Sequence, residues 1–176
     1  MKKYCTLLLW LALTYTSTAQ KLKVDEVDEF TNKSVKRTSW ETLNSDFSSN
    51  IYLRVSELDG YLILNLKLMK VNKSVLSVHE DMRLMLKMQN DSIVTLHAIE
   101  STVSCRGCGA IGLFGGGSAW GIEINYDITE SEFYALRNLP VKKIRLYTTD
   151  GYIEEDISNK NADLIIRLLY LLENQS

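Results

Sequence analysis

Two cysteines and the glycines around them are the residues in this chain best suited to carry chemistry. Cys105 and Cys108 form a C-x-x-C pair, and seven of the nine glycines fall between Gly107 and Gly121. In an oxidising compartment such a pair predicts a small disulfide ring. A redox-active pair would need its first cysteine at a helix N-terminus, where the helix dipole lowers the thiol pKa. No helix is predicted there, so the order of preference is structural disulfide, then redox activity, then metal binding.

No set of metal ligands can be assembled around the cysteine pair. A closed zinc site needs four ligands. His79 and His97 are the only histidines, and their spacing to the pair fits no standard zinc module. Each is interpreted as a structural histidine, and no metal is predicted.

The glycine-rich segment supports two further interpretations. The string from Gly107 to Gly112 matches the dinucleotide fingerprint G-x-G-x-x-G, but no helix N-terminus follows to bind the phosphates, so no nucleotide cofactor is predicted. The segment also carries four apolar side chains that could form a contact loop for a partner, namely Ile111, Leu113, Phe114 and Trp120. The alternative is that the loop folds back over an open end of the sheet and buries them.

No catalytic residue is assigned. The chain contains no G-x-S-x-G, H-E-x-x-H or P-loop motif, and Ser118 has no identifiable base. The carboxylates of Glu154, Glu155 and Asp156 are clustered, but neighbours on a strand point to opposite faces and cannot all meet one substrate. A solvated sheet edge is the favoured interpretation of this cluster. The sequence therefore favours a non-enzymatic protein.

The N-terminus predicts export. Met1, Lys2 and Lys3 precede an apolar run at residues 6–15, and small residues end at Ala19, which is the layout of a secretory signal peptide over residues 1–19. Cleavage there would leave 157 residues with 18 basic and 22 acidic side chains, a net charge of −4. An acidic surface argues against nucleic-acid binding. No later segment is long enough to span a bilayer, so no transmembrane anchor is expected after cleavage.

The elements that would position these residues are mainly antiparallel strands. Three hairpins are predicted around Asp59-Gly60, Asn90-Asp91 and Asp150-Gly151, with arms at 51–58 and 61–69, 82–88 and 92–103, and 141–149 and 152–157. Residues 120–128 alternate as a half-buried strand. Residues 20–33 are expected to form a lead-in or an edge strand, ahead of a single globular domain over 34–176.

Two helices complete the predicted α+β domain. A capping box of Thr129 and Glu132 predicts a short helix over about 130–138. A C-terminal helix is expected over about 159–173, with Ser158 as its N-cap. Its predicted core stripe contains Ala162, Ile165, Ile166, Leu169 and Leu172, widened by Leu164, Leu168 and Leu171. A helix this apolar is packed on two sides or meets a partner, and packing on the sheet is preferred.

The Ala19-Gln20 junction, the segment VDEVDEFTNKSVKRTSWETL and the segment KKIRLYTTDGYIEEDI resemble small uncharacterised exported proteins of Bacteroidetes bacteria. The resemblance implies a periplasmic or secreted location and brings no catalytic residues. The expected function is a non-enzymatic binding or structural domain of the cell envelope, with an envelope or extracellular protein or a glycan as partner. A thiol–disulfide protein using Cys105 and Cys108 is the alternative, and an envelope-polymer hydrolase is the weaker one.

Overall fold

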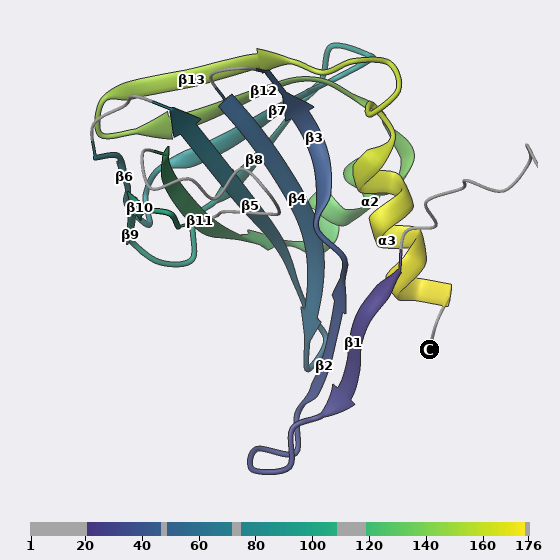
Figure 1. Ribbon diagram of the computed structural model, residues 1–176. Coiled ribbons are helices and arrows are strands. Elements are labelled where there is room, and N and C mark those ends of the chain that lie inside the picture. Colours follow the sequence, from purple (N-terminus) through teal and green to yellow (C-terminus); the bar gives the residue numbers. More distant parts are fainter. Residues whose placement is uncertain (1–20, 47–48, 72–74, 109–118, 175–176) are drawn as a thin grey trace, which may run out of the picture.

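The structure is a computed structural model that describes residues 21–46, 49–71, 75–108 and 119–174. Within these ranges it contains strands that assemble into a larger and a smaller antiparallel sheet, together with two helices (Figure 1). The fold class predicted from the sequence, antiparallel α+β, is confirmed. The predicted signal peptide lies outside the described residues.

The larger sheet has the strand order β1-β2-β4-β5-β11-β10, and β3 also pairs with β4. These strands are β1 (Leu22–Val27), β2 (Ser34–Thr38), β3 (Glu41–Ser45), β4 (Ser49–Leu58), β5 (Tyr61–Val71), β10 (Cys105–Arg106) and β11 (Ala119–Ile128). Of the two interpretations of residues 20–33, the edge strand is therefore the one that the structure shows.

The smaller sheet has four strands in the order β13-β12-β7-β8. They are β7 (Arg83–Met88), β8 (Ile93–His97), β12 (Val141–Thr148) and β13 (Gly151–Asp156). A separate two-stranded ribbon joins β6 (Ser77–Val78) to β9 (Thr102–Val103). An isolated bridge between Ala98 and Tyr126 ties the end of β8 to β11.

The core fills the space between the inner faces of the two sheets. In Figure 1 the four-stranded sheet lies across the top of the molecule, and the helices α2 (Glu130–Asn138) and α3 (Leu164–Asn174) stand together at one side. Buried aliphatic side chains from both sheets and from both helices form one continuous cluster. The outer face of the four-stranded sheet therefore carries the polar half of each alternating strand.

The three predicted hairpins are present. Asp59 and Gly60 form a two-residue turn in which both residues have positive φ, 52° and 85°, so that Leu58 pairs with Tyr61. The second turn places Asp91 at φ 66°. In the third, Thr148 pairs with Gly151, so the turn is Thr149-Asp150 and lies one residue earlier than predicted. This change alters the cross-strand pairing but not the face on which each side chain lies.

Two predicted boundaries are wrong. The second arm of the middle hairpin ends at His97, not near Val103, because the chain turns there and Ile99 donates its N–H to the Asn125 carbonyl (2.9 Å). The C-terminal helix begins at Leu164 instead of Asn159. Ala162 accepts a backbone hydrogen bond from Val141 (2.8 Å), and this holds the preceding residues as turns.

Both helices bury the apolar faces that their sequences indicate. The Thr129–Glu132 capping box is formed, and α2 starts directly after it. In α3 the buried side chains are Leu164, Ile165, Leu168, Leu169 and Leu172, whereas Ile166 and Leu171 lie at the rim. The helix packs against α2 on one side and against β4 on another. In the described ranges no helix has the length and apolarity needed to cross a membrane.

Candidate binding face of the four-stranded sheet

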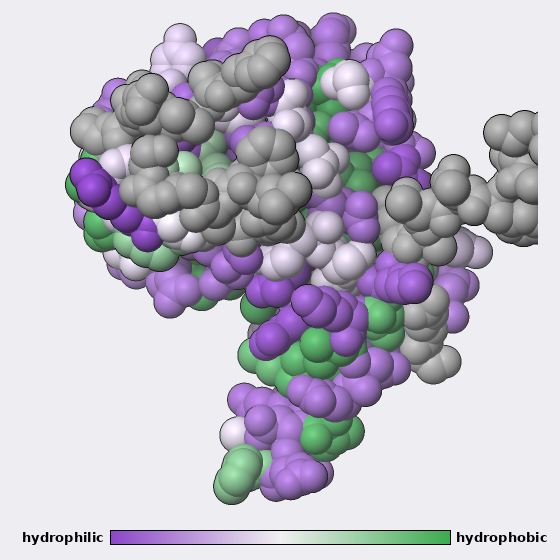
Figure 2. All heavy atoms as spheres, viewed as in Figure 1, coloured by the Kyte–Doolittle hydropathy of each residue, from purple (hydrophilic) through white to green (hydrophobic). Residues whose placement is uncertain are grey.

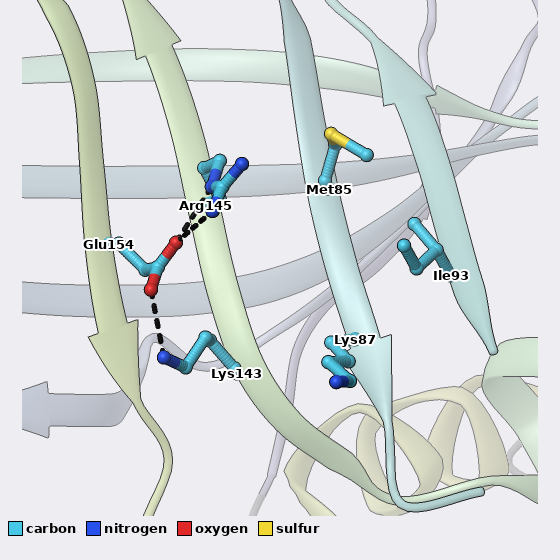
Figure 3. A pocket seen from close by; sticks show the side chains of 6 residues that line it. All are labelled: Met85, Lys87, Ile93, Lys143, Arg145 and Glu154. Atoms are coloured by element: carbon cyan, nitrogen blue, oxygen red, sulfur yellow. Dashed lines mark hydrogen bonds and ion pairs between the residues drawn. The ribbon is translucent and has the colours of Figure 1, made fainter. Parts of the chain in front are cut away.

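The outer face of the four-stranded sheet carries a shallow depression of about 240 Å³. It is lined by Met85, Lys87, Ile93, Lys143, Arg145 and Glu154, a set referred to below as the sheet-face depression. Figure 3 shows these side chains on neighbouring strands, with Glu154 directed at its two basic neighbours. The register brings them together, because Arg145 pairs with Met85 on one side and with Glu154 on the other.

Glu154 holds the two basic side chains of β12 in place. Its carboxylate accepts a hydrogen bond from Lys143 Nζ (2.8 Å) and another from Arg145 Nε (2.7 Å). The bond from Lys143, followed by that from Arg145, lowers the pKa of the Glu154 carboxyl. The bond to Glu154 in turn raises the pKa of the Lys143 ammonium. The charges of this cluster are therefore fixed near neutral pH.

Further charges surround the depression. Lys87 forms an ion pair with Asp91 (3.0 Å), which also meets Lys142 (3.3 Å), and Lys143 meets Asp156 (3.3 Å). Three cations and one carboxylate line the depression itself. With the direct ion-pair partners included, four cations face three carboxylates, so the face retains positive charge.

Aromatic side chains extend this face toward the β12–β13 turn. Tyr147 and Tyr152 lie across the two strands with their ring centroids 6.2 Å apart. The Arg145 guanidinium lies 4.7 Å from the Tyr152 ring and that of Arg83 lies 5.8 Å from the Tyr147 ring. Arg145 stacks in this way while its Nε and Nη2 both donate to Glu154.

Glu154 is poorly placed to transfer protons near neutral pH. A general acid or base works best when its pKa lies near the working pH. The carboxyl pKa of Glu154 is instead lowered by its basic partners. Its neighbour Glu155 points to the opposite face and accepts a hydrogen bond from Asn44 (3.3 Å), so the expected divergence of the acidic cluster is confirmed.

The outer face of the larger sheet carries a second polar cluster. The Trp40 ring has the Arg54 guanidinium and the Lys67 ammonium each 4.3 Å from its centroid. Glu123 pairs with both cations, at 3.1 Å and 3.3 Å. Trp40 also packs against a small buried group that contains Tyr52 and Met69. These contacts pair the charges of the cluster with one another.

A buried asparagine extends this second cluster. Asn65 is 5% exposed. Its Oδ1 accepts hydrogen bonds from Ser56 Oγ (2.6 Å) and Arg54 Nε (3.2 Å), and its Nδ2 donates to Asn125 Oδ1 (2.6 Å). Sequence reasoning missed both the network and Trp40, because the partners come from distant strands.

The cysteine pair lies at the edge of the larger sheet. Cys105 and Cys108 lie close together, with their Cα atoms 5.3 Å apart. Cys105 pairs with Gly121, and Arg106 pairs with Trp120, whose ring lies 5.7 Å from the Arg106 guanidinium. The predicted contact residues Ile111, Leu113 and Phe114, together with Ser118, lie outside the described residues. Trp120 is half-buried.

The two histidines are both exposed. His97 ends β8, and His79 lies between β6 and β7. Within the part of the chain that the structure describes, no group of three or more His, Cys, Asp or Glu side chains could hold a metal ion.

Comparisons with known proteins return no relative. No protein-family model, no curated protein and no solved structure matches this chain.

Proposed function

We propose that this protein is an exported, non-enzymatic binding domain of the cell envelope, and that the sheet-face depression is its binding surface. The ligand class is a group that joins a carboxylate, or a similar anion, to a small apolar moiety. The observation that carries the proposal is the depression itself, in which cations from β7 and β12 surround two apolar side chains, the exposed Ile93 and the half-buried Met85.

The chemistry of the lining supports an anionic ligand. Arginine and lysine donate several hydrogen bonds and accept none. Glu154 accepts hydrogen bonds from Lys143 Nζ and from both Nε and Nη2 of Arg145, and these bonds use two of the five N–H groups of the guanidinium. Because the ion pairs hold these side chains in one geometry, less conformational entropy would be lost when a ligand binds.

The apolar side chains support a mixed ligand. Ile93 is exposed on the first residue of β8, and Met85 lies half-buried beside Arg145 in the register of the sheet. Thioether side chains adapt to irregular apolar groups and make favourable contacts with aromatic rings. An apolar wall next to a basic donor set therefore fits a short apolar group attached to an anion.

Export to the cell envelope is part of the proposal. It is supported by the charged start, apolar run and small residues of the first nineteen positions. The two cysteines lie close enough to form a disulfide, and such a bond would accord with an oxidising compartment.

Phenylacetate, which carries one carboxylate on one aromatic ring, is a suitable probe. We expect saturable changes in the amide NMR shifts of Lys87, Lys143 and Arg145, with affinity in the millimolar range. Lys87→Glu replaces a cation with an anion and is expected to weaken binding about tenfold, since two unit charges about 4 Å apart interact by about 1 kcal/mol even in bulk water. Lys160→Glu makes the same charge change in the turn before α3 and serves as the control.

The affinities of the two variants show whether the depression is the binding surface. Equal affinity in the wild type and Lys87→Glu, or shifts confined to other strands, would remove the depression as the binding surface. Weakened binding in Lys87→Glu with unchanged binding in Lys160→Glu would support it.

A thiol–disulfide role is the second candidate, because Cys108 is exposed and paired with Cys105. A disulfide that stays oxidised in a glutathione buffer would exclude redox exchange, whereas ready reduction would favour it.

The glycine-rich contact loop also remains a prediction. Phe114→Ala is expected to leave thermal stability nearly unchanged if that side chain is a contact residue.

A further inference from the structure

The hairpin of β1 and β2 presents the most exposed large hydrophobic side chain of the described residues. Phe30, in the turn of this hairpin, is 97% exposed, and Val27 at the end of β1 is also exposed. Figure 1 shows the hairpin projecting from the body of the molecule, at the opposite end from the four-stranded sheet. Figure 2 shows apolar side chains interspersed with hydrophilic ones on this projection. An aromatic ring held so far from the core has no packing role in the fold.

The turn that carries Phe30 is tightly organised. The Asp28 carboxylate accepts hydrogen bonds from the N–H of Phe30 (3.0 Å), the N–H of Thr31 (2.7 Å) and the Thr31 hydroxyl (2.8 Å). Asp28 N–H donates to the Lys33 carbonyl (2.9 Å), and Asn32 N–H donates to the Asp28 carbonyl (2.8 Å). A preorganised turn lowers the entropy lost when its exposed ring is bound.

The same turn is strongly acidic. Residues 25–33, referred to below as the acidic tip, contain four carboxylates and one lysine, a net charge of −3. The carboxylates belong to Asp25, Glu26, Asp28 and Glu29. An anionic bilayer surface would repel such a tip. A surface that binds this tip must therefore combine an apolar pocket with positive charge.

The sheet-face depression has both properties. A cavity of about 150 Å³ admits benzene, and this depression measures about 240 Å³. With the direct ion-pair partners included, it carries four cations against three carboxylates, beside Met85 and Ile93. The acidic tip in turn presents the carboxylate of Glu29 next in sequence to the apolar ring of Phe30, which matches the proposed combination of an anion and an apolar group.

We propose that the acidic tip of one copy docks on the sheet-face depression of a second copy, with Phe30 between Met85 and Ile93 and Glu29 near Lys87. This inference rests on the proposed function of the depression. Because the two surfaces lie at opposite ends of the molecule, the contact is head-to-tail and leaves one tip and one depression free at the ends of each oligomer. A contact of this small size is weak and forms at high local concentration.

Sedimentation velocity over a micromolar to millimolar range tests the contact. The wild type is expected to show a rising average sedimentation coefficient that continues beyond the dimer and is reduced in high salt. Phe30→Gln is expected to weaken association about tenfold or more, as removal of a central aromatic contact does. Tyr134→Gln removes an exposed aromatic ring from α2 instead and is expected to associate like the wild type.

Charge exchange identifies the two surfaces. Glu29→Lys and Lys87→Glu are each expected to weaken association, and a chain that carries both changes is expected to recover it. A mixture of Phe30→Gln and Lys87→Glu offers one intact depression and one intact tip, and is expected to stop at a heterodimer. The head-to-tail contact would be overturned if neither single charge change weakened association, or if the wild type formed a dimer but no larger oligomer.

The probe separates this inference from the proposed function. If phenylacetate binds the depression while the wild type stays monomeric at every concentration, the inference fails and the proposed function stands. If phenylacetate does not bind and association persists in Lys87→Glu, both fail. Competition, in which phenylacetate dissociates the wild-type oligomers, would support both.

Discussion

The hydroxyl of Tyr126 provides a sharp test of how the core is assembled. Tyr126 lies on β11 and is 0% exposed, and no described residue makes a hydrogen bond with its Oη. Burial raises the pKa of this phenol, because the charged form would be poorly solvated. A buried polar group without a partner costs about 1–3 kcal/mol. We therefore expect Tyr126→Phe to increase the free energy of unfolding by about 1 kcal/mol.

Urea unfolding measures this change directly. For a domain of this size about 1 kcal/mol corresponds to a rise in Tm of about 2–4 °C, and the m value is expected to stay constant. Tyr61→Phe, which removes an exposed hydroxyl from the start of β5, is expected to change stability by less than about 0.5 kcal/mol. Tyr126→Ala should instead lower stability by about 4 kcal/mol, since it leaves a cavity. A loss of about 1 kcal/mol or more in Tyr126→Phe would refute the reasoning, because it would mean that the hydroxyl is hydrogen-bonded.

Three further outcomes are expected. Trp40→Ala should lower the free energy of unfolding by about 2–3 kcal/mol, since the ring stacks on two cations and packs on a buried group; urea unfolding of the variant checks this. Gly60→Ala should cost about 1 kcal/mol because φ is +85° there, and Gly60→Asn should cost less, as compared by thermal unfolding. Hydrogen bonds from Thr31, first through its N–H and then its hydroxyl, lower the pKa of Asp28. Asp28 therefore stabilises the turn at pH values above the ordinary carboxyl pKa, and this contribution is lost as pH falls through the lowered pKa. Amide exchange at Phe30 and Thr31 should accelerate over that acidic range.

Local signals explain why much of the fold could be predicted. Positive φ at Asp59 and Gly60 is encoded by the residue types themselves, and the Thr129–Glu132 box needs only four consecutive residues. The start of α3 could not be predicted in this way. The chain before Leu164 is fixed by a hydrogen bond from the N–H of Val141, on β12, to the Ala162 carbonyl. Boundaries set by tertiary hydrogen bonds leave no periodic pattern in the sequence.

The candidate site was missed for a related reason. Lys143 and Arg145 are two residues apart, which places them on the same face of a strand, and Glu154 follows on the next strand after the turn. The sequence therefore contained a signal for this part of the cluster. Its pairing depended on a turn that lies one residue from the predicted place, and Lys87 comes from a strand far away in sequence. Phe30 sits in a segment without clear patterning, where exposure cannot be inferred from residue type.

The central claim concerns where an anionic aromatic ligand binds. The most direct measurement is the set of intermolecular nuclear Overhauser effects from the ring protons of bound phenylacetate. Contacts with the Met85 and Ile93 methyl groups are expected, and at the same probe concentration they should be weaker in Lys87→Glu but unchanged in Lys160→Glu. Contacts with Trp40 on the other sheet, or none with the four-stranded sheet at saturating probe, would contradict the account.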